Sequence, residues 1–170
     1  IMFYLIFCFI IVFFFSFWRG HRISENCSGI QYTLHFIIPL LCVCVILGGR
    51  YGWATDYLHY MLTYQFDDDG YYEPLFQKIN SVLHIFKAPF PVAFFVYALI
   101  CYGSALVLFK QFPKVTYLIF PCFVCLYFYD SSNLVRFSIG MAFIMLSIKY
   151  MMGEKTNLKF FIFFSICAIL

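Results

Sequence analysis

The sequence predicts an all-α protein whose helices cross a membrane several times. Of its 170 residues, 64% are hydrophobic and 24% aromatic, whereas only 11% are charged. About a quarter of the residues in a soluble domain are charged, so this composition excludes an ordinary soluble fold. A second observation is a series of apolar runs close to the ~20 residues that cross a bilayer as a helix. A third is an alternation of charge between the loops that separate these runs.

About six apolar segments are present, and we expect each of them to form a spanning helix. They cover residues 1–18, 32–49, 89–109, 113–129, 134–152 and 158 onward. Pro39 and Pro121 fall inside two of them, which membrane helices tolerate where neighbouring groups satisfy the freed backbone. Because both ends lie in apolar runs, we expect residues 1–170 to be one transmembrane domain of a longer protein.

The charges of the loops predict which side each loop faces. Basic residues outnumber acidic ones in the first, third and fifth loops, at Arg19, Arg22, Lys110, Lys114, Lys149, Lys155 and Lys159. These loops are therefore expected in the cytoplasm. The second loop, residues 50–88, carries five acidic side chains against three basic ones. It is expected outside the membrane, together with the fourth loop and the N-terminus.

The sequence of the second loop indicates folded structure. Apolar residues recur in it at helical spacing, at Leu75, Ile79, Val82, Leu83 and Phe86. This spacing predicts an amphipathic helix along the membrane surface, and Pro74 suits its first turn. The preceding DDDG lacks the ligand spacing of an EF-hand calcium loop, so it is interpreted as a solvated acidic turn.

The eight cysteines are expected to act as small apolar side chains. Seven of them lie inside apolar runs, and only Cys27 lies in a polar loop. Cys122 and Cys125 have the spacing of a CxxC pair, but no second pair or nearby histidine completes a zinc site. No metal, cofactor or nucleic-acid partner is expected.

Two arginines stand where apolar segments reach the outer surface. Arg50 follows the second segment, within GGRYGWATDY, and Arg136 opens the fifth. A guanidinium stays charged and presents a planar fork of donors that matches phosphate oxygens. Two arginines from separate segments on one side of the membrane therefore indicate an anion site. The alternatives are a snorkelling anchor for Arg50 and an ion pair with Asp130 for Arg136.

Asp56 lies six residues after Arg50 and has two interpretations. It is either the ion-pair partner of that arginine or a general base that takes a proton from a sugar hydroxyl. The spacing of the residues leaves both interpretations open.

Three elements, in this order, resemble the EpsG family of Wzy-like polysaccharide polymerases. They are GGRYGWATDYLHY, YYEPLFQKIN and NLVRFSIGMAFIMLSIKYM, and the resemblance covers roughly residues 45 to 155. The chain departs from the family pattern at Ala54, where glycine is usual, and at Phe137, where glutamine is usual. The resemblance implies functional roles for Arg50, Tyr51, Asp56, Tyr57, Glu73, Pro74 and Arg136.

The resemblance also implies a GT-C-like glycosyltransferase in the bacterial inner membrane that makes an exopolysaccharide, capsule or O-antigen. It would move a growing glycan from undecaprenyl pyrophosphate onto the next lipid-linked repeat unit without using a metal. We expect Arg50 and Arg136 to stabilise the leaving pyrophosphate. Asp56 or Glu73 is the expected base for the attacking hydroxyl. The aromatic side chains expected along the sugar path are those of Tyr51, Trp53 and Tyr57.

The expected partners are the lipid-linked glycan, the bilayer, and a chain-length regulator or flippase. Two other functions would also place arginines at the headgroup level. One is a transporter or flippase of lipid-linked oligosaccharides, although these segments show no clear internal repeat. The other is a non-catalytic partner in polysaccharide export, in which neutral replacements of Arg50 and Arg136 would leave activity intact.

Overall fold

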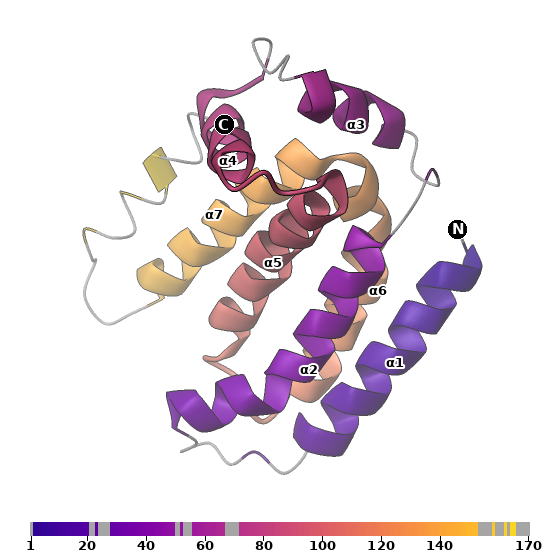
Figure 1. Ribbon diagram of the computed structural model, residues 1–170. Helices are drawn as coiled ribbons and strands as arrows, with labels where there is room; N and C mark the ends of the chain where they lie inside the picture. Colours follow the sequence, from indigo (N-terminus) through magenta and orange to yellow (C-terminus); the bar gives the residue numbers. More distant parts are fainter. Residues whose placement is uncertain are drawn as a thin grey trace.

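The protein is built of helices, as its composition predicts. The computed structural model describes residues 2–20, 23, 28–49, 52, 56–66, 72–152, 158, 162, 164 and 165. Within these residues there is no strand, so the predicted all-helical class is confirmed (Figure 1). The helices in chain order are α1 (Met2–Gly20), α2 (Gly29–Gly48), α3 (Tyr57–Phe66), α4 (Pro74–Ile85), α5 (Phe90–Phe109), α6 (Thr116–Asn133) and α7 (Val135–Met151).

Among the described residues, two helices are long and apolar enough to cross a membrane. They are α2 and α5, each of 20 residues, with mean hydropathies of 2.2 and 2.3. Shorter apolar helices cover Ile6–Gly20 and Thr116–Ser131. Five of the six predicted segments correspond to α1, α2, α5, α6 and α7, while most of the segment from residue 158 lies outside the described residues.

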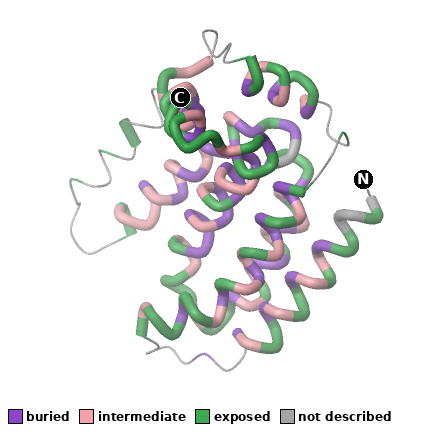
Figure 2. Tube along the Cα trace, viewed as in Figure 1, coloured by how far each residue is buried: buried purple, intermediate pink, exposed green. Residues whose placement is uncertain are grey.

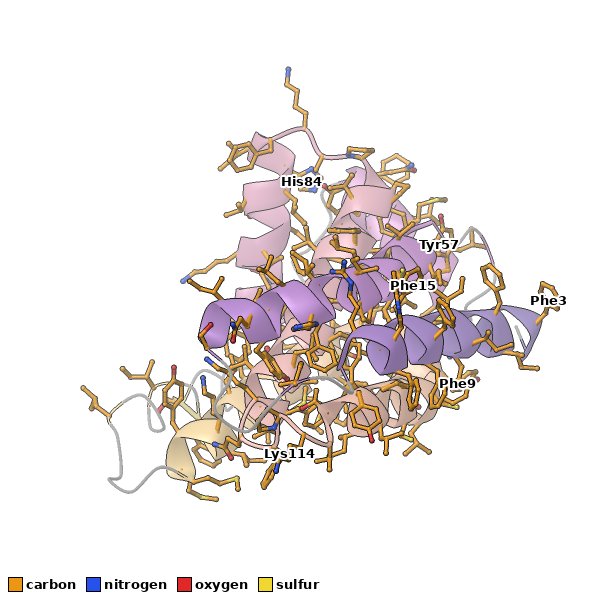
Figure 3. The ribbon with its side chains drawn as sticks, turned by 90° about the horizontal axis from the view of Figure 1, so that it is seen from below. Phe3, Phe9, Phe15, Tyr57, His84 and Lys114 are labelled. Atoms are coloured by element: carbon orange, nitrogen blue, oxygen red, sulfur yellow. The ribbon has the colours of Figure 1, made fainter. Side chains whose placement is uncertain are left out.

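Helix α5 is the centre of the bundle. It packs against α2, α6 and α7, and α1 packs against α2 and α6 on the other side (Figure 1). Buried positions of these helices face one another, while exposed positions alternate with them on the outside (Figure 2). Helix α1 exposes large apolar side chains such as Phe3, which projects away from the bundle (Figure 3). Such a surface suits contact with lipid.

The loops gather at two opposite ends of the bundle (Figure 1). Gln111 Nε2 donates a hydrogen bond of 3.0 Å to the Lys149 carbonyl, which joins the α5–α6 turn to the end of α7. A Cβ added to Gly29 would lie 2.7 Å from Lys110 Nζ, so α2 begins at this same end. The basic loops thus share one end, and α3 and α4 lie at the other. Which end faces the cytoplasm stays a prediction.

The α6–α7 connection is shorter than the sequence analysis expects. Instead of a polar fourth loop, the single residue Leu134 separates the two helices. Its backbone N donates to the Asp130 carbonyl at 2.7 Å, and its own carbonyl accepts from Ser138 N at 2.9 Å. Because these hydrogen bonds continue both helical ladders up to the junction, the polar residues before Leu134 form the last turn of α6. Arg136 is therefore fixed in the first turn of α7.

Helix α4 occupies the segment predicted to be amphipathic, but it buries a different face. The buried side chains are those of Phe76, Asn80 and Leu83, whereas Val82, Ile85 and Phe86 are exposed. The sequence pattern excludes Asn80 from an apolar face because its amide is polar. In the structure this amide is buried because its side-chain oxygen accepts a hydrogen bond from the Tyr97 hydroxyl of α5. The exposed apolar residues suit a helix in contact with a membrane surface.

Candidate functional site

An aromatic cluster holds α3 and α4 against the ends of α5 and α7. Its buried residues are Tyr57, Tyr60, Tyr64, Phe76, Leu83, Phe90, Ala93, Phe94, Tyr97, Val135 and Ile139. Rings from different helices meet at short distances, as in the pair of Phe76 and Tyr97, whose centroids lie 5.4 Å apart. Such aromatic contacts fix the positions of the helices that carry them. Helices α3 and α4 are therefore packed parts of the protein.

A pocket of about 310 Å³ lies between α3, the start of α4 and α7. It is lined by Tyr60, Glu73, Leu134, Arg136, Phe137, Gly140, Met141 and Ile144. The polar side chains come from three different parts of the chain, whereas the apolar ones follow one face of α7 and the Leu134 junction. The pocket thus has one polar and one apolar wall, and it suits a ligand with a charged group joined to an apolar group.

The polar wall is organised around Arg136. Its Nη1 donates to both carboxylate oxygens of Glu73, at 2.9 Å and 3.1 Å. The side chain of Arg136 is 38% exposed and that of Glu73 is 30% exposed, so solvent reaches this ion pair. The Nε of Arg136 is buried and has no hydrogen-bond partner among the described residues. A donor of this kind remains available for an acceptor on a ligand.

Tyr72 supports the arginine from the other side. The guanidinium carbon lies 4.8 Å from the centroid of the Tyr72 ring, a cation–π contact. The Tyr72 hydroxyl lies at hydrogen-bond distance, 3.2 Å, from Thr63 Oγ1 of α3. Its carbonyl accepts a hydrogen bond of 2.6 Å from Gln77 Nε2 of α4. The ring that contacts Arg136 is thus tied by hydrogen bonds to both α3 and α4.

Tyr60 is the third polar side chain of the pocket. Burial raises the pKa of its phenol above the ordinary value, while a hydrogen bond with Arg136 and the charge of that residue act in the opposite direction. A guanidinium has no acceptor, so the phenol oxygen accepts this hydrogen bond and the phenol proton stays available. Tyr60 can therefore donate to a ligand in the pocket at neutral pH.

The predicted site residues are only partly brought together. Glu73 and Arg136, which the sequence analysis gives separate roles, form one ion pair, so Arg136 pairs with Glu73 rather than with Asp130. Asp56 directly precedes α3, where its carbonyl accepts a hydrogen bond from Tyr60 N at 3.0 Å, and it is not among the described residues that line the pocket. Its role as a base stays a prediction.

Of the three aromatic residues predicted to line the sugar path, the structure describes only Tyr57. Tyr57 is buried, with its ring centroid 5.4 Å from that of Phe90 and 5.8 Å from that of Phe94. It therefore contributes to the packing of α3 on α5, and contact with substrate stays a prediction. Arg50, Tyr51 and Trp53 lie outside the described residues.

The sequence analysis misses Tyr60, Tyr72 and the apolar wall of α7. One signal for the wall is present in the sequence, since Phe137, Gly140, Met141 and Ile144 recur at helical spacing behind Arg136. No comparable signal identifies the two tyrosines, because the chain contains 14 tyrosines. Their roles follow only from the packing of α3 and α4 beside α7.

The potential metal ligands of the protein remain dispersed. Among the described residues, no three side chains of His, Cys, Asp or Glu come together as metal ligands would. Cys122 and Cys125, the CxxC pair, are both free thiols.

Comparison with known proteins gives a family match. A sequence model of the EpsG family matches residues 33–170, which include α3, α4, α7 and the whole described lining of the pocket. No curated protein and no solved structure matches the chain.

Proposed function

The chain belongs to the EpsG family and is a membrane protein of polysaccharide biosynthesis, and we propose that it polymerises the glycan. In this proposal it joins oligosaccharide repeat units carried on undecaprenyl pyrophosphate at the outer face of the bacterial inner membrane. The product is an exopolysaccharide, a capsule or an O-antigen. A chain-length regulator or a flippase is the protein partner that we propose.

The ion pair of Arg136 and Glu73, inside a pocket with one polar and one apolar wall, carries this proposal. A lipid pyrophosphate has the same two parts, because its anionic headgroup is joined to a hydrocarbon chain. The guanidinium supplies donors for phosphate oxygens. The apolar face of α7 supplies a surface for the start of the lipid chain. The pocket therefore suits an amphiphilic anion.

The proposed reaction begins with an exchange of partners at Arg136. The pyrophosphate of the donor competes with the Glu73 carboxylate for the guanidinium, and the released carboxylate accepts the proton of the attacking hydroxyl. A bond forms between that hydroxyl oxygen and the anomeric carbon of the donor glycan. The bond from this carbon to the pyrophosphate oxygen breaks, and the lipid pyrophosphate leaves with the bonding electrons. Arg136 stabilises the charge that develops on it.

Other residues complete the proposal. Asp56 is the alternative base, at the start of the helix that carries Tyr60. Arg50, which follows α2 in the sequence, is proposed to bind the pyrophosphate together with Arg136. Tyr51, Trp53 and Tyr57 are proposed to line the path of the sugars.

The test is polymerisation by the purified full-length protein, supplied with its lipid-linked repeat unit in the presence and absence of a chelator. We expect a ladder of products on a gel that resolves chain length, and we expect it to persist with chelator. Arg136→Ala should abolish the ladder while the protein stays folded. The matched control is Lys114→Ala, which removes a positive charge at the opposite end of the bundle.

Two results would contradict the proposal. A normal ladder from folded Arg136→Ala would exclude the role of this arginine. The absence of a ladder from the wild type, given an authenticated substrate, would favour transport of lipid-linked oligosaccharides or a non-catalytic role in export.

A further inference from the structure

A second cavity, of about 480 Å³, lies between α3 and the start of α5. The side chains that line it include Tyr57, Tyr64, Gln65, His84, Lys87 and Phe90. These residues come from α3, the end of α4 and the start of α5, which lie together at one end of the bundle (Figure 1). None of these residues contributes to the pocket around Arg136. The cavity is therefore a separate feature of the same end of the protein.

Lys87 has an unusual backbone conformation for its residue type. Its φ of 50° makes it the only non-glycine with positive φ among the described residues. It follows the C-cap of α4, where its N donates to the His84 carbonyl at 2.8 Å and Ala88 N donates to the Leu83 carbonyl at 3.0 Å. This is the hydrogen-bond pattern of a Schellman motif, whose left-handed position is usually glycine. A lysine at such a position is uncommon, which makes its side chain a candidate for a role in binding.

The position of Lys87 just before α5 predicts that it lies at the level of the lipid headgroups. Helix α5, which is apolar enough to span a membrane, begins three residues later at Phe90. A charged side chain just before such a helix lies at the membrane interface, where lipid phosphates are found. The ammonium group of Lys87 is therefore placed to contact a phosphate at the membrane surface.

The rest of the cavity combines a fixed aromatic wall with one exposed amide. The rings of Tyr64 and His84 stack with centroids 4.3 Å apart, and the Tyr64 hydroxyl donates to the Ala88 carbonyl at 2.8 Å, which fixes this wall. Gln65 adds an exposed amide that can both donate and accept hydrogen bonds. The described lining contains no carboxylate, so nothing in it opposes an anion. The Gln65 amide and the Lys87 ammonium group together suit the hydroxyl groups and the phosphate of a sugar phosphate.

Helix α3 contributes neighbouring side chains of one face to this cavity and to the pocket around Arg136. Tyr60 lines the Arg136 pocket, whereas Tyr57, Met61 and Tyr64 of the same helix line the cavity. A polymerase of lipid-linked units must hold two lipid pyrophosphates at once, one on the donor and one on the acceptor. We propose that the cavity at Lys87 is the acceptor subsite, which binds the sugar pyrophosphate of the incoming unit while the far end of that unit reaches the neighbouring pocket around Arg136. This inference rests on the proposed function.

The test separates the two substrates in a single-addition assay with the full-length protein in nanodiscs. A donor whose terminal hydroxyl is methylated cannot accept a glycan. An acceptor whose sugar is joined to the lipid pyrophosphate by a carbon–phosphorus bond cannot act as a donor. The concentration of each substrate is varied separately to obtain its KM with the wild type, Lys87→Gly, Lys87→Arg and the control Lys78→Ala. This control removes an exposed lysine of α4 that does not line the cavity.

We expect Lys87→Gly to raise the KM for the acceptor about tenfold or more, since it removes a charge-assisted contact. The KM for the donor should stay unchanged. Lys87→Arg should restore most of the acceptor affinity, and Lys78→Ala should match the wild type. Glycine is the residue best suited to the backbone at position 87, so a loss of folding is not expected to confuse this result. The melting temperature of each variant checks this.

A second acceptor, with a neutral alkyl group in place of the lipid pyrophosphate, distinguishes headgroup recognition from binding of bulk anionic lipid. The effect of Lys87→Gly should disappear with this acceptor. An unchanged acceptor KM in Lys87→Gly, or an equal rise in both KM values, would overturn the acceptor subsite while leaving the polymerase proposal intact. No product from the wild type would overturn the polymerase proposal itself, and the acceptor subsite with it.

Discussion

Arg136 Nη1 lies 2.9 Å and 3.1 Å from the two carboxylate oxygens of Glu73, which stands 63 residues earlier in the chain. This ion pair joins the first turn of α7 to the residue that precedes α4. It neutralises an arginine at the mouth of a largely apolar pocket. Because the pair is partly exposed, an anion that enters from solvent can compete with the carboxylate for the guanidinium.

Replacing the carboxylate of this pair tests its chemical role. Glu73→Gln keeps the shape of the side chain but removes its charge and its ability to take a proton. We expect turnover to fall by a factor of about 100 or more if Glu73 is the base. The free energy of unfolding should change by less than about 1 kcal/mol, because a partly exposed ion pair contributes little. Turnover is measured by release of lipid pyrophosphate, and stability by thermal denaturation.

The control for this variant is Asp130→Asn, which removes a carboxylate near the α6–α7 junction that does not line the pocket. It should retain wild-type turnover. Full activity of Glu73→Gln would exclude Glu73 as the base and leave Asp56 as the candidate.

The phenol of Tyr60 should stay protonated, and so able to donate a hydrogen bond to substrate, over a wide pH range. Burial raises the pKa of this group above its ordinary value, so the hydroxyl keeps its proton below about pH 10. The hydrogen bond that it donates is lost only as the pH rises beyond that. We expect Tyr60→Phe to lower kcat about tenfold, by removing one hydrogen bond to a charged group.

The pH profile of kcat between about pH 6 and 9 should keep the same shape in Tyr60→Phe, because Tyr60 does not titrate there. Tyr72→Phe is the matched variant, since it keeps the ring under Arg136 and should be nearly as active as the wild type. A titration step between about pH 6 and 9 that is present in the wild type and absent in Tyr60→Phe would contradict the role of Tyr60 as a protonated donor.

The volume of the pocket can be tested from its apolar wall. Gly140 lines the pocket, and a Cβ added to it would meet no atom within 4 Å. Gly140→Leu should therefore fold normally and fill space that the substrate needs, raising KM at least about tenfold. Gly103 has the same clearance but does not line the pocket, so Gly103→Leu is the control. Equal KM values for the wild type and Gly140→Leu would show that substrate binds elsewhere.

The packing of α2 on α5 depends on a close approach at Gly48. A Cβ added there would lie 3.0 Å from the Pro91 carbonyl oxygen and 3.1 Å from Phe95 Cβ. Small residues at such crossings allow membrane helices to approach closely. We expect Gly48→Ala to lower the free energy of unfolding by about 1–3 kcal/mol, as overpacking does.

Gly103→Ala provides the comparison for Gly48→Ala, since the added methyl group meets no neighbouring atom within 4 Å. Denaturation in detergent should leave its stability close to that of the wild type. Equal stabilities of the two variants would mean that α2 and α5 are less closely packed than the structure indicates.

The sequence predicts the class of the fold well because length, hydropathy and loop charge are local properties. The positions of α1, α2, α5, α6 and α7 follow from the apolar runs. The ends of helices are less predictable, and the junction at Leu134 is an example. Polar residues before it indicate a loop, yet the hydrogen bond from Leu134 N to the Asp130 carbonyl keeps them in α6.

The site is predictable in its residue types but not in its contacts. Arg136 and Glu73 are identified by charge and family pattern, while their pairing depends on how α4 packs beside α7. The buried face of α4 is missed for a similar reason. Asn80 is buried through its hydrogen bond with Tyr97, a residue 17 positions away on another helix. Neither contact leaves a periodic signal in the sequence.

The one-residue junction at Leu134 determines which wall of the pocket can move. Two long helices joined by a single residue cannot slide past each other without breaking backbone hydrogen bonds, so α6 and α7 behave as one stiff unit at this end. Helices α3 and α4 are attached to that unit through side chains, among them Glu73 and Tyr72. In the proposed polymerisation, room for the growing glycan would therefore come from displacement of α3 and α4, while Arg136 keeps its position relative to α6.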